Sequence, residues 1–530
     1  MTVQTMTMEL RPYQLEARNA IHEEWRKGNK RTLLVLPTGC GKTIVFSKVI
    51  EDCVKEGERV LVLAHRTELL DQAADKLEKS TGLKCAVEKA EQTSIGSFYR
   101  VVVGSVQTMM RDSRLKQFSP SHFQTVIVDE AHHAVSDSYQ KVLNHFNLAN
   151  VLGVTATPDR GDMRNIGSFF DTLAYEYKLP MAIKQGYLSP IKALTIPLKL
   201  DLTNVRQQSG DFAASDLDTA LDPYLERIAH EMWQVAKHRK IVVFLPLIAT
   251  SQRFADILNR IGFKAAEVNG ESYDRQQVIR DFEKGRYNVL CNSMLLTEGW
   301  DCPSVDCIVV LRPTKSRSLY SQMIGRGTRL YQGKKELLVL DFLWHTERHA
   351  LSHPAHLIAE SDEIAEAMTK RIEEAGEAVD LEDAQKDAVE SALKEREQSL
   401  AKQLEQNKNR SKKLVDHVQY EISIQAEDLI NYQPAFSWEF EPTTEQQIQF
   451  IESAGINAEG ILTKGKASKL INHVVSRRQE GLATPKQIIL LEKRGFQHVG
   501  TWNFGKADRL ITKMALNNWR IPYGIDPKTY

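Results

Sequence analysis

The sequence predicts an α/β protein with two successive parallel sheets, followed by a helical arm and a small helical tail. Short, nearly continuous apolar runs alternate with helical stretches through the first two thirds of the chain, as a parallel sheet requires. A long run rich in Ala, Glu, Lys, Gln and Leu follows, and a tandem repeat ends the chain. We expect four parts, at residues 1–189, 190–350, 351–440 and 441–530.

Composition narrows the class of protein. The 530 residues are 42% hydrophobic and 26% charged, which is ordinary for a globular chain. No apolar stretch reaches the roughly 18 residues that a membrane span needs, and Met1–Leu10 does not resemble a secretion signal. The six cysteines form no CxxC pair, which favours a reducing cytoplasm and no structural metal. Since the formal net charge is zero, any nucleic-acid surface must be a local patch.

The first candidate site is a loop after a buried strand. Arg31–Leu36 is an apolar strand, and the next residues form a turn from which a helix starts at Lys42. A helix N-terminus after such a turn suits phosphate binding, with Lys42 on the β- and γ-phosphates of ATP and Thr43 on Mg²⁺. The turn consists of Pro37, Thr38, Gly39, Cys40 and Gly41. Leu36 replaces the first glycine of the full pattern, so a simple Gly-Lys-Thr turn is the alternative.

A second buried strand, Thr125–Asp129, ends in two carboxylates. Asp129 is suited to hold Mg²⁺ through water, and Glu130 to orient and deprotonate an attacking water. A solvated strand end is the alternative, and the upstream loop argues against it. His132 and His133 follow, but one histidine pair provides too few ligands for a closed zinc site.

These segments belong to an ordered series: Leu10–Gln14, Pro37–Thr43, Asp129–His132, Thr155–Pro158, Asn269–Gly270, Thr297–Asp301 and Gln322–Arg329. With this series, residues 8–345 resemble superfamily 2 helicases and translocases of the DEAH type. Within them the chain is most similar to the RadD (YejH)-like and type III restriction motor-like group. The match to DEAD-box RNA helicases is poorer. The resemblance implies two tandem RecA-like (P-loop NTPase) domains that use ATP and Mg²⁺ and act on DNA.

The resemblance also implies roles for single residues. Gln14 would bind the adenine edge with Arg11 beside it, and Thr155 and Thr157 would connect the ATP site to the second domain. Gly299 and Asp301 would lie at the nucleotide. The residues implied to contact the nucleic-acid backbone are His65, Arg66, Thr67, Ser105, Gln107 and Thr297.

Two arginines are expected to complete the ATP site from the second domain. Arg326 and Arg329 follow Gln322 in one motif and would act as arginine fingers, which supply positive charge to the γ-phosphate. Their spacing of three predicts that both lie on one face of a helix from about Leu319 to Leu330. Two solvated arginines on an exposed helix are the alternative.

The second domain is expected to start near Leu188–Pro190, and Ile241–Leu245 is its first clear strand. Asp201–Ala229 has no clear buried strand and is interpreted as an insertion. Beyond the domain, residues 355–415 contain no proline and a single glycine, Gly376, which predicts long helix. Acidic residues exceed basic ones from Glu360 to Lys413, so we interpret this arm as a solvated spacer, with docking of a protein partner as the alternative.

The tail carries a gap-free repeat at an offset of 40 residues. Thr444 with Gln447 recurs as Thr484 with Gln487, a spacing that predicts a capping box at the start of a helix. Each unit should be a helix, an extended loop and a second helix, and the two copies should pack together. Basic residues exceed acidic ones from Glu441 to Tyr530, and Lys466 and Lys506 occupy equivalent positions. The pattern resembles DNA-binding SAP-like modules, with a protein-docking module as the alternative.

The sequence therefore predicts an ATP-dependent DNA helicase or translocase of the cytoplasm. Its partners would be single-stranded, duplex or branched DNA and, through the tail, a repair or replication protein, with no membrane. The expected context is DNA repair, recombination or the replication of phages and mobile elements. The alternatives are an RNA helicase and a nucleic-acid-stimulated ATPase that acts as an adaptor. No nuclease constellation is visible in the tail.

Overall fold

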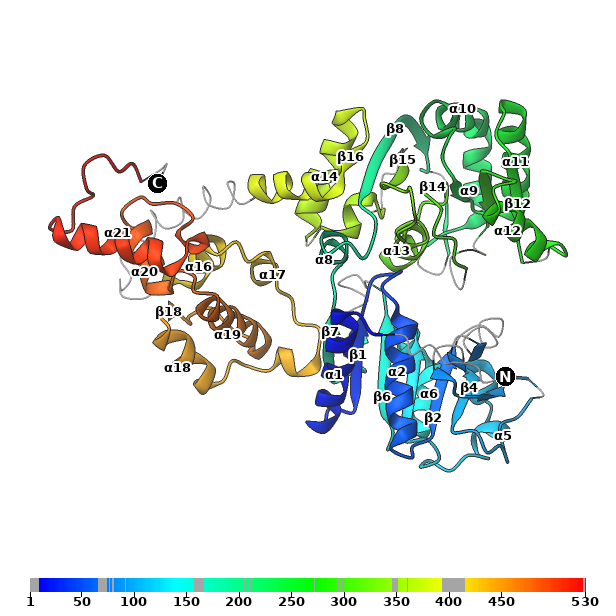
Figure 1. Ribbon diagram of the computed structural model, residues 1–530, viewed down its shortest axis with the longest axis horizontal. Helices are drawn as coiled ribbons and strands as arrows, with labels where there is room; N and C mark the ends of the chain where they lie inside the picture. The colour runs from blue at the N-terminus through cyan, green and yellow to red at the C-terminus, as the bar shows by residue number, and fades with distance from the viewer. Residues whose placement is uncertain are drawn as a thin grey trace. The chain divides into compact units, whose positions relative to one another are not determined.

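In a computed structural model (Figure 1), the chain forms two compact units. The first comprises residues 1–358 and 368–385, and the second comprises 359–367 and 386–530. The structure describes residues 9–64, 74–75, 77–78, 81–90, 92–156, 166–203, 205–208, 211–270, 272–293, 296, 300–345, 351–359, 361–392, 415–527 and 530.

The first unit begins with a parallel sheet that has seven strands in the described ranges, in the order β3-β4-β2-β5-β6-β1-β7. The strands are β1 Arg31–Val35, β2 Val60–Ala64, β3 Cys85–Glu88, β4 Val101–Ser105, β5 Thr125–Asp129, β6 Asn150–Thr155 and β7 Thr172–Glu176. Because β5, β6 and β1 are neighbours in a parallel sheet, the loops after their carboxyl ends meet at one edge.

Helices precede, connect and follow the strands of this sheet (Figure 1). They are α1 Pro12–Arg26, α2 Lys42–Lys55, α4 Val106–Met109, α5 Asp112–Leu115, α6 Asp137–His145 and α8 Leu179–Lys184. Strand residues such as Leu33, Val62 and Ile127 are almost completely buried, which agrees with a sheet covered on both faces.

The second sheet of this unit has the order β12-β13-β11-β14-β15-β8-β16 among the described residues. Its strands are β8 Ile191–Asp201, β11 Ile241–Phe244, β12 Ala265–Val268, β13 Val289–Asn292, β14 Cys307–Val310, β15 Leu337–His345 and β16 Val379–Asp380. All pairings are parallel except that of β16 with β8. β8 precedes β11 in the chain and belongs to the same sheet, so the expectation that Ile241–Leu245 is the first strand of the second domain is wrong.

The interpretation of Asp201–Ala229 as an insertion is wrong. A short hairpin of β9 Gln207–Gln208 and β10 Asp211–Phe212 leads into α9 Ala214–Leu221 and α10 Leu225–Ala236. Ile228 and Met232 of α10 are fully buried in one core with Val243 of β11 and Val309 of β14. A segment can belong to a domain core as a helix packed on the sheet, without being a strand of it. The lack of a strand pattern in this stretch was therefore no sign of an insertion.

Three further helices complete this domain: α11 Ile248–Ile261, α12 Arg275–Glu283 and α13 Arg317–Gly325.

The expected long helix of the arm is interrupted. α14 spans Asp362–Ala375 and ends before Gly376, whose φ of +66° lies in the left-handed region that favours glycine. β16 follows and pairs antiparallel with β8 at the edge of the second sheet, after which helix resumes over residues 381–392. Val379 and Asp380 of the arm thus belong to the second sheet, so this part of the arm is not a solvated spacer. Residues 393–414 lie outside the described ranges.

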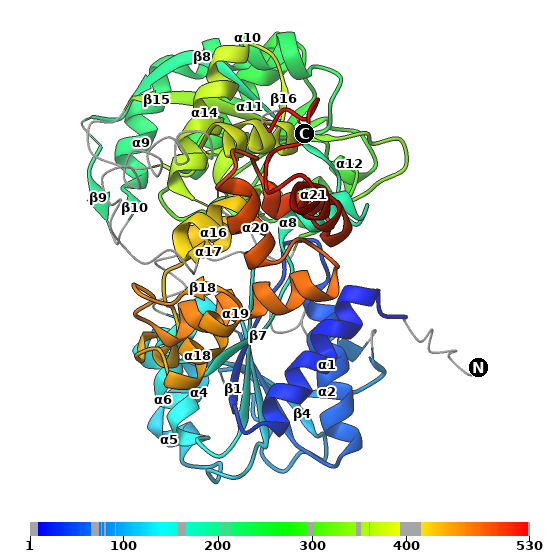
Figure 2. The ribbon, with the colours of Figure 1, turned by 90° about the vertical axis from the view of Figure 1, so that its left-hand side faces the viewer.

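The second unit contains the tail helices, shown in Figure 2. They are α16 His417–Ser423, α17 Glu427–Ile430, α18 Glu445–Ser453, α19 Lys464–Gln479, α20 Pro485–Glu492 and α21 Phe504–Leu516. Thr444 and Thr484 cap α18 and α20 through the expected boxes with Gln447 and Gln487. Ile451 and Leu470 of the first copy share one core with Leu491 and Leu510 of the second.

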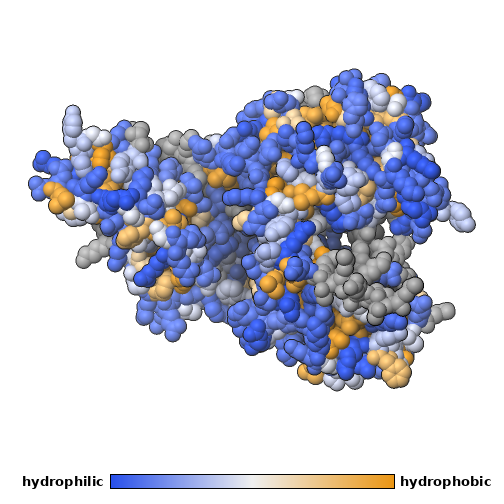
Figure 3. All heavy atoms as spheres, in the orientation of Figure 1, coloured by the Kyte–Doolittle hydropathy of each residue, from blue (hydrophilic) through white to orange (hydrophobic). Residues whose placement is uncertain are grey.

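On the face drawn in Figure 3, hydrophilic side chains predominate and apolar ones lie in small separate groups. Within the described residues, no helix is both long enough and apolar enough to cross a membrane. The six cysteines are free thiols, and burial raises the pKa of Cys40 in the phosphate loop to about 11.

Candidate active site

The loop after β1 has the geometry of a phosphate cradle. Gly39 and Gly41 have φ values of +94° and +78°, and Gly41 caps α2. A Cβ on Gly41 would lie 2.6 Å from Gln14 Nε2, so any larger residue at position 41 would clash with the Gln14 side chain. The Thr38 hydroxyl is buried and has no hydrogen-bond partner among the described residues. A buried orphan hydroxyl beside a helix N-terminus fits a bound phosphate, whose oxygen would accept a hydrogen bond from it.

The two acidic residues at the end of β5, Asp129 and Glu130, lie opposite this loop. Lys42 Nζ is 3.9 Å from Glu130 Oε1, and the backbone N–H of Glu130 donates to Asp129 Oδ1 at 3.1 Å. Glu130 has a φ of +54°, an uncommon left-handed conformation for a residue with a side chain. His132 Nδ1 lies 3.7 Å from Glu130 Oε2. The sheet order thus brings Lys42, Asp129 and Glu130 together although about 90 residues separate them.

Gln14 supports the phosphate loop directly. Its Nε2 donates to the Cys40 carbonyl at 3.0 Å, and its Oε1 accepts from the backbone N–H of Arg11 at 3.0 Å. The Tyr13 hydroxyl donates to the same Cys40 carbonyl at 2.9 Å. Gln14 Nε2 also donates to the Tyr13 hydroxyl at 3.5 Å, so both ends of the carboxamide are engaged within the protein, and the adenine contact implied for Gln14 stays a prediction.

Sequence reasoning missed an aromatic group beside Tyr13. Tyr177 stacks on Tyr13 with ring centroids 4.3 Å apart, and Tyr187 meets it edge-on at 4.9 Å. The Arg11 guanidinium lies 5.0 Å from the Tyr187 ring centroid. Burial raises the pKa of Tyr13 to about 12, so its phenol stays protonated and able to donate. No motif spacing links these tyrosines, because they come from separate segments about 160 residues downstream.

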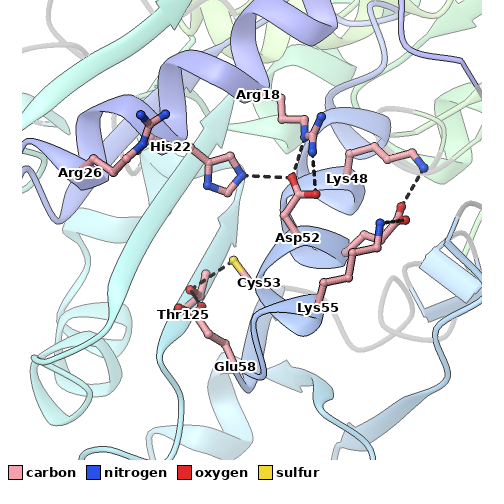
Figure 4. Close-up of polar contacts among 10 residues, drawn as sticks. Arg18, His22, Arg26, Lys48, Asp52, Cys53, Lys55, Glu58 and Thr125 are labelled. Carbon is pink, nitrogen blue, oxygen red and sulfur yellow. Dashed lines mark hydrogen bonds and ion pairs between the residues drawn. The ribbon is translucent and has the colours of Figure 1, made fainter.

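An ion-pair cluster locks α1 to α2 (Figure 4). Arg18 donates to both oxygens of Asp52 at 2.6 and 2.7 Å, and His22 Nε2 lies 3.1 Å from Asp52 Oδ2. Burial raises the pKa of Asp52, but the hydrogen bonds from Arg18 and His22 outweigh burial and hold it below its usual value. Because α1 carries Gln14 and α2 starts at the phosphate loop, this cluster fixes one relative to the other.

The two candidate arginine fingers do not share a helix. α13 ends at Gly325, so Arg326 lies at its C-terminal cap and Arg329 lies in the following loop. The expected helix from Leu319 to Leu330 is therefore wrong at its end. A Cβ on Gly327 would lie 2.4 Å from Leu337 Cδ1, so the chain runs close against β15 here and departs from the helical path.

In this structure both arginines contact groups of the second domain. Arg326 Nη1 donates to the Trp300 carbonyl at 2.7 Å, and Arg329 forms an ion pair with Asp301. Burial lowers the pKa of Arg329.

The segment that carries these arginines nevertheless borders the phosphate loop. A Cβ on Gly325 would lie 2.4 Å from Thr38 Cβ, and the Thr328 hydroxyl lies 3.5 Å from the Thr38 carbonyl. Gln322 of the same motif is 6% exposed.

The remaining candidate residues are placed unequally. Ser105 is fully buried and donates to Gln107 Oε1 at 2.6 Å, so only the exposed Gln107 presents its side chain to a ligand. Thr155 is 1% exposed at the end of β6. His65, Arg66, Thr67, Thr157, Thr297 and Gly299 lie outside the described residues.

The tail lysines are engaged within the tail. Lys466 Nζ pairs with Glu421 Oε1 at 3.1 Å, and Glu421 is 2% exposed. Lys506 Nζ lies 4.0 Å from the Trp502 ring centroid and donates to the main-chain oxygen of Tyr530 at 2.8 Å. Both lysine charges are thus paired inside the second unit in this structure.

Comparison with known proteins identifies the two domains. Residues 7–160 match the family described as type III restriction enzyme, res subunit, and residues 223–331 match the helicase conserved C-terminal domain. The two RecA-like domains are thus similar to helicase domains and to the motor domains of restriction enzymes.

Individual relatives agree. IRC3 of Saccharomyces cerevisiae, named as an ATP-dependent helicase, is 32% identical over 67% of this chain and 54% of its own length. The EcoAI endonuclease subunit of a type I restriction enzyme of Escherichia coli is 28% identical over 64% of this chain and 47% of its own length. The chain thus spans about half the length of these curated relatives.

Among solved structures, the DNA-bound type ISP restriction-modification enzyme LlaBIII covers 97% of this chain. The matched region is 40% of that enzyme, with a TM-score of 0.54 and 16% identity, which shows a shared fold.

Proposed function

We propose that this protein is an ATP-dependent DNA helicase or translocase. The observation that carries the proposal is the phosphate cradle after β1, which contains a buried orphan Thr38 hydroxyl and in which Lys42 faces Glu130. Domains of helicase families surround this site, and the arginine-bearing segment of the second domain borders it. A nucleotide held there would touch both domains, so its binding and loss would change how they meet.

The chain's own residues account for the chemistry. The loop N–H groups, Thr38 and Lys42 would bind the phosphates of ATP. Thr43 and Asp129 would hold Mg²⁺, which supplies positive charge to the phosphates. Glu130 would orient and deprotonate the attacking water. Arg326 and Arg329 would neutralise charge that develops on the γ-phosphate after leaving their contacts with Trp300 and Asp301.

DNA is the proposed polymer because the relatives include restriction motors, one of them solved with DNA bound. The tail is a candidate for a second DNA contact. Arg509 and Lys513 are exposed one turn apart on α21, and Trp519 and Tyr523 are exposed beyond it. Cations with exposed aromatic rings suit a nucleic-acid backbone and its bases. A repair or replication protein is the proposed alternative ligand of the tail, and the cytoplasm the proposed compartment.

The first test measures ATP hydrolysis with single-stranded, duplex, forked and junction DNA and with RNA, beside a strand-displacement assay. We expect DNA to stimulate hydrolysis more than RNA does. Stronger stimulation by RNA would favour an RNA helicase. Stimulation by DNA without strand displacement or movement along duplex would favour the adaptor ATPase.

Variants assign the site. Lys42→Ala should weaken ATP binding, whereas Glu130→Gln should retain binding and lose hydrolysis, because Glu130 acts on the water and not on the nucleotide. Lys55→Ala is the matched control, since Lys55 lies on the same helix and its side chain is 67% exposed. Equal loss of nucleotide binding in the Lys42 and Glu130 variants would refute these roles.

A further inference from the structure

Lys334 lies in the turn between the candidate arginine fingers and β15, and its ammonium group faces back to the arginine segment. Its Nζ donates to the carbonyl oxygens of Gly327 and, at 2.9 Å, of Arg329. No motif singled this residue out, and its neighbour Lys335 is exposed. The carbonyl oxygens that accept from Lys334 flank Thr328, within the segment that borders the phosphate loop.

A second residue completes the attachment of this segment. The backbone N–H of Ser189 donates to the Thr328 carbonyl at 2.7 Å, and its hydroxyl donates to the Arg329 carbonyl at 3.1 Å. Ser189 is 1% exposed and stands two residues before β8. Three consecutive carbonyls, from Gly327 to Arg329, thus receive hydrogen bonds from Lys334 and Ser189.

α13 ends at Gly325, so the carbonyls of Gly327, Thr328 and Arg329 lie in the loop beyond it, where neither a helix nor a strand supplies their donors. Such carbonyls need hydrogen-bond donors from elsewhere in the chain when they are withdrawn from water. A lysine ammonium is a good partner for them because it provides three donors and a positive charge. The path of the backbone from Arg326 to Arg329 therefore depends on a side chain outside the helix.

We propose that Lys334 is a positioning residue for ATP hydrolysis, which holds the backbone of Arg326 and Arg329 at the height of the phosphate loop. The inference rests on the proposed ATPase function. It adds a residue that touches neither nucleotide nor nucleic acid and acts through the two arginines.

The charge of Lys334 gives the inference a pH signature. Burial lowers the pKa of Lys334 to about 8, and Asp306 and the Cys302 thiol are the titratable groups that oppose this shift. As pH rises through 8, the folded chain loses the ammonium charge and the hold on the carbonyls weakens. The unfolded chain keeps that proton up to about pH 10. Between about pH 8 and pH 10 the unfolded chain therefore binds more protons than the folded one, and the contribution of Lys334 to the free energy of unfolding rises with pH. Deprotonation of Lys334 above pH 8 therefore does not unfold the chain, and a fall in turnover there would reflect the weaker hold on the carbonyls.

The test compares Lys334→Met, Lys334→Arg and the control Lys335→Met in the full chain with saturating DNA. A displacement of about 1 Å at a catalytic group can cost about 100-fold in rate. We expect Lys334→Met to lower kcat by about 10- to 100-fold with KM for ATP changed less than threefold. Lys334→Arg should recover most of kcat and remove the fall in kcat near pH 8, and Lys335→Met should match the wild-type protein.

Amide hydrogen exchange over residues 326–330 gives a readout that does not need activity. We expect faster exchange in Lys334→Met than in Lys335→Met. An unchanged kcat in Lys334→Met, or a rise in KM alone, would overturn the inference. If the wild-type chain hydrolysed no ATP with any nucleic acid, the proposed function would fail, and unchanged exchange in Lys334→Met would then overturn the inference separately.

Discussion

Lys466 and Lys506 provide a matched pair of perturbations, because the repeat places them at the same position of two similar helices. Lys466 on α19 lies 3.1 Å and 3.2 Å from the two carboxylate oxygens of Glu421, which is 2% exposed. Lys506 on α21 rests over the Trp502 ring at 4.0 Å. The same change, Lys→Met, therefore removes a buried ion pair in one copy. In the other copy it removes a surface cation–π contact and an exposed hydrogen bond to the Tyr530 main-chain oxygen.

The expected effects differ in size. Removing one partner of a buried ion pair costs about 3–5 kcal/mol, because the other charge stays buried without its cation. Losing a half-exposed cation–π contact costs about 1 kcal/mol. Lys466→Met should thus destabilise the tail by roughly 3 kcal/mol and Lys506→Met by roughly 1 kcal/mol. The double variant Lys466→Met/Glu421→Leu should recover most of the loss, since it removes both charges.

Amide hydrogen exchange of α19 and α21 in the full chain measures these differences as free energies of opening. Exchange is preferable to a single melting temperature because a chain of several domains does not unfold in one step. Equal effects of the two lysine variants, or a double variant as unstable as Lys466→Met, would refute the reasoning. A loss of DNA affinity in Lys466→Met without loss of α19 protection would also refute it and restore Lys466 as a DNA contact.

Three further predictions follow from the site and the tail. Asp52→Asn should destabilise the first domain by about 1–3 kcal/mol in thermal unfolding. In the wild-type chain, the contribution of Asp52 to the free energy of unfolding should be complete above about pH 4 and decline below it, since the pKa of Asp52 is lowered in the fold. Arg326→Ala or Arg329→Ala should lower kcat for ATP about 10³-fold with little change in ATP affinity; near-normal turnover in both would exclude the finger role. Arg509→Gln/Lys513→Gln should weaken DNA binding and reduce its log–log salt dependence by up to about 0.9 per lost phosphate contact on duplex, whereas an unchanged slope would favour a protein ligand for the tail.

Much of the candidate site could be predicted because its signals are local. The phosphate loop needs a strand, two glycines and a helix start within a dozen residues, and all three are visible between Arg31 and Thr43. The caps of the tail are equally local, since Thr444 and Gln447 bond across a single helical turn. In such cases the hydrogen bonds that define the structure join residues that are neighbours in the chain.

What failed depended on contacts between distant residues. The assignment of α10 to the core could not be predicted from a missing strand, because its burial is decided by β11 and β14, which come later in the chain. Gln14 bonds to Cys40, and Lys334 supports Arg329, without any spacing rule that relates them. The end of α13 was likewise misplaced, since Gly325 and Gly327 weaken the helix there and the close approach of Gly327 to Leu337 of β15 decides the path of the chain.

The sequence by itself therefore determined the class of domain, the strand–loop–helix form of the candidate phosphate loop and the helical repeat of the tail. The tertiary structure alone decided which groups each charged side chain meets. Arg329 forms an ion pair with Asp301, and Lys466 forms one with Glu421. Lys334 donates hydrogen bonds to carbonyls after α13. The physical reason is that ion pairs and caps between separate segments require the sheet order to bring those segments together, and a linear pattern of residue types does not encode that distance.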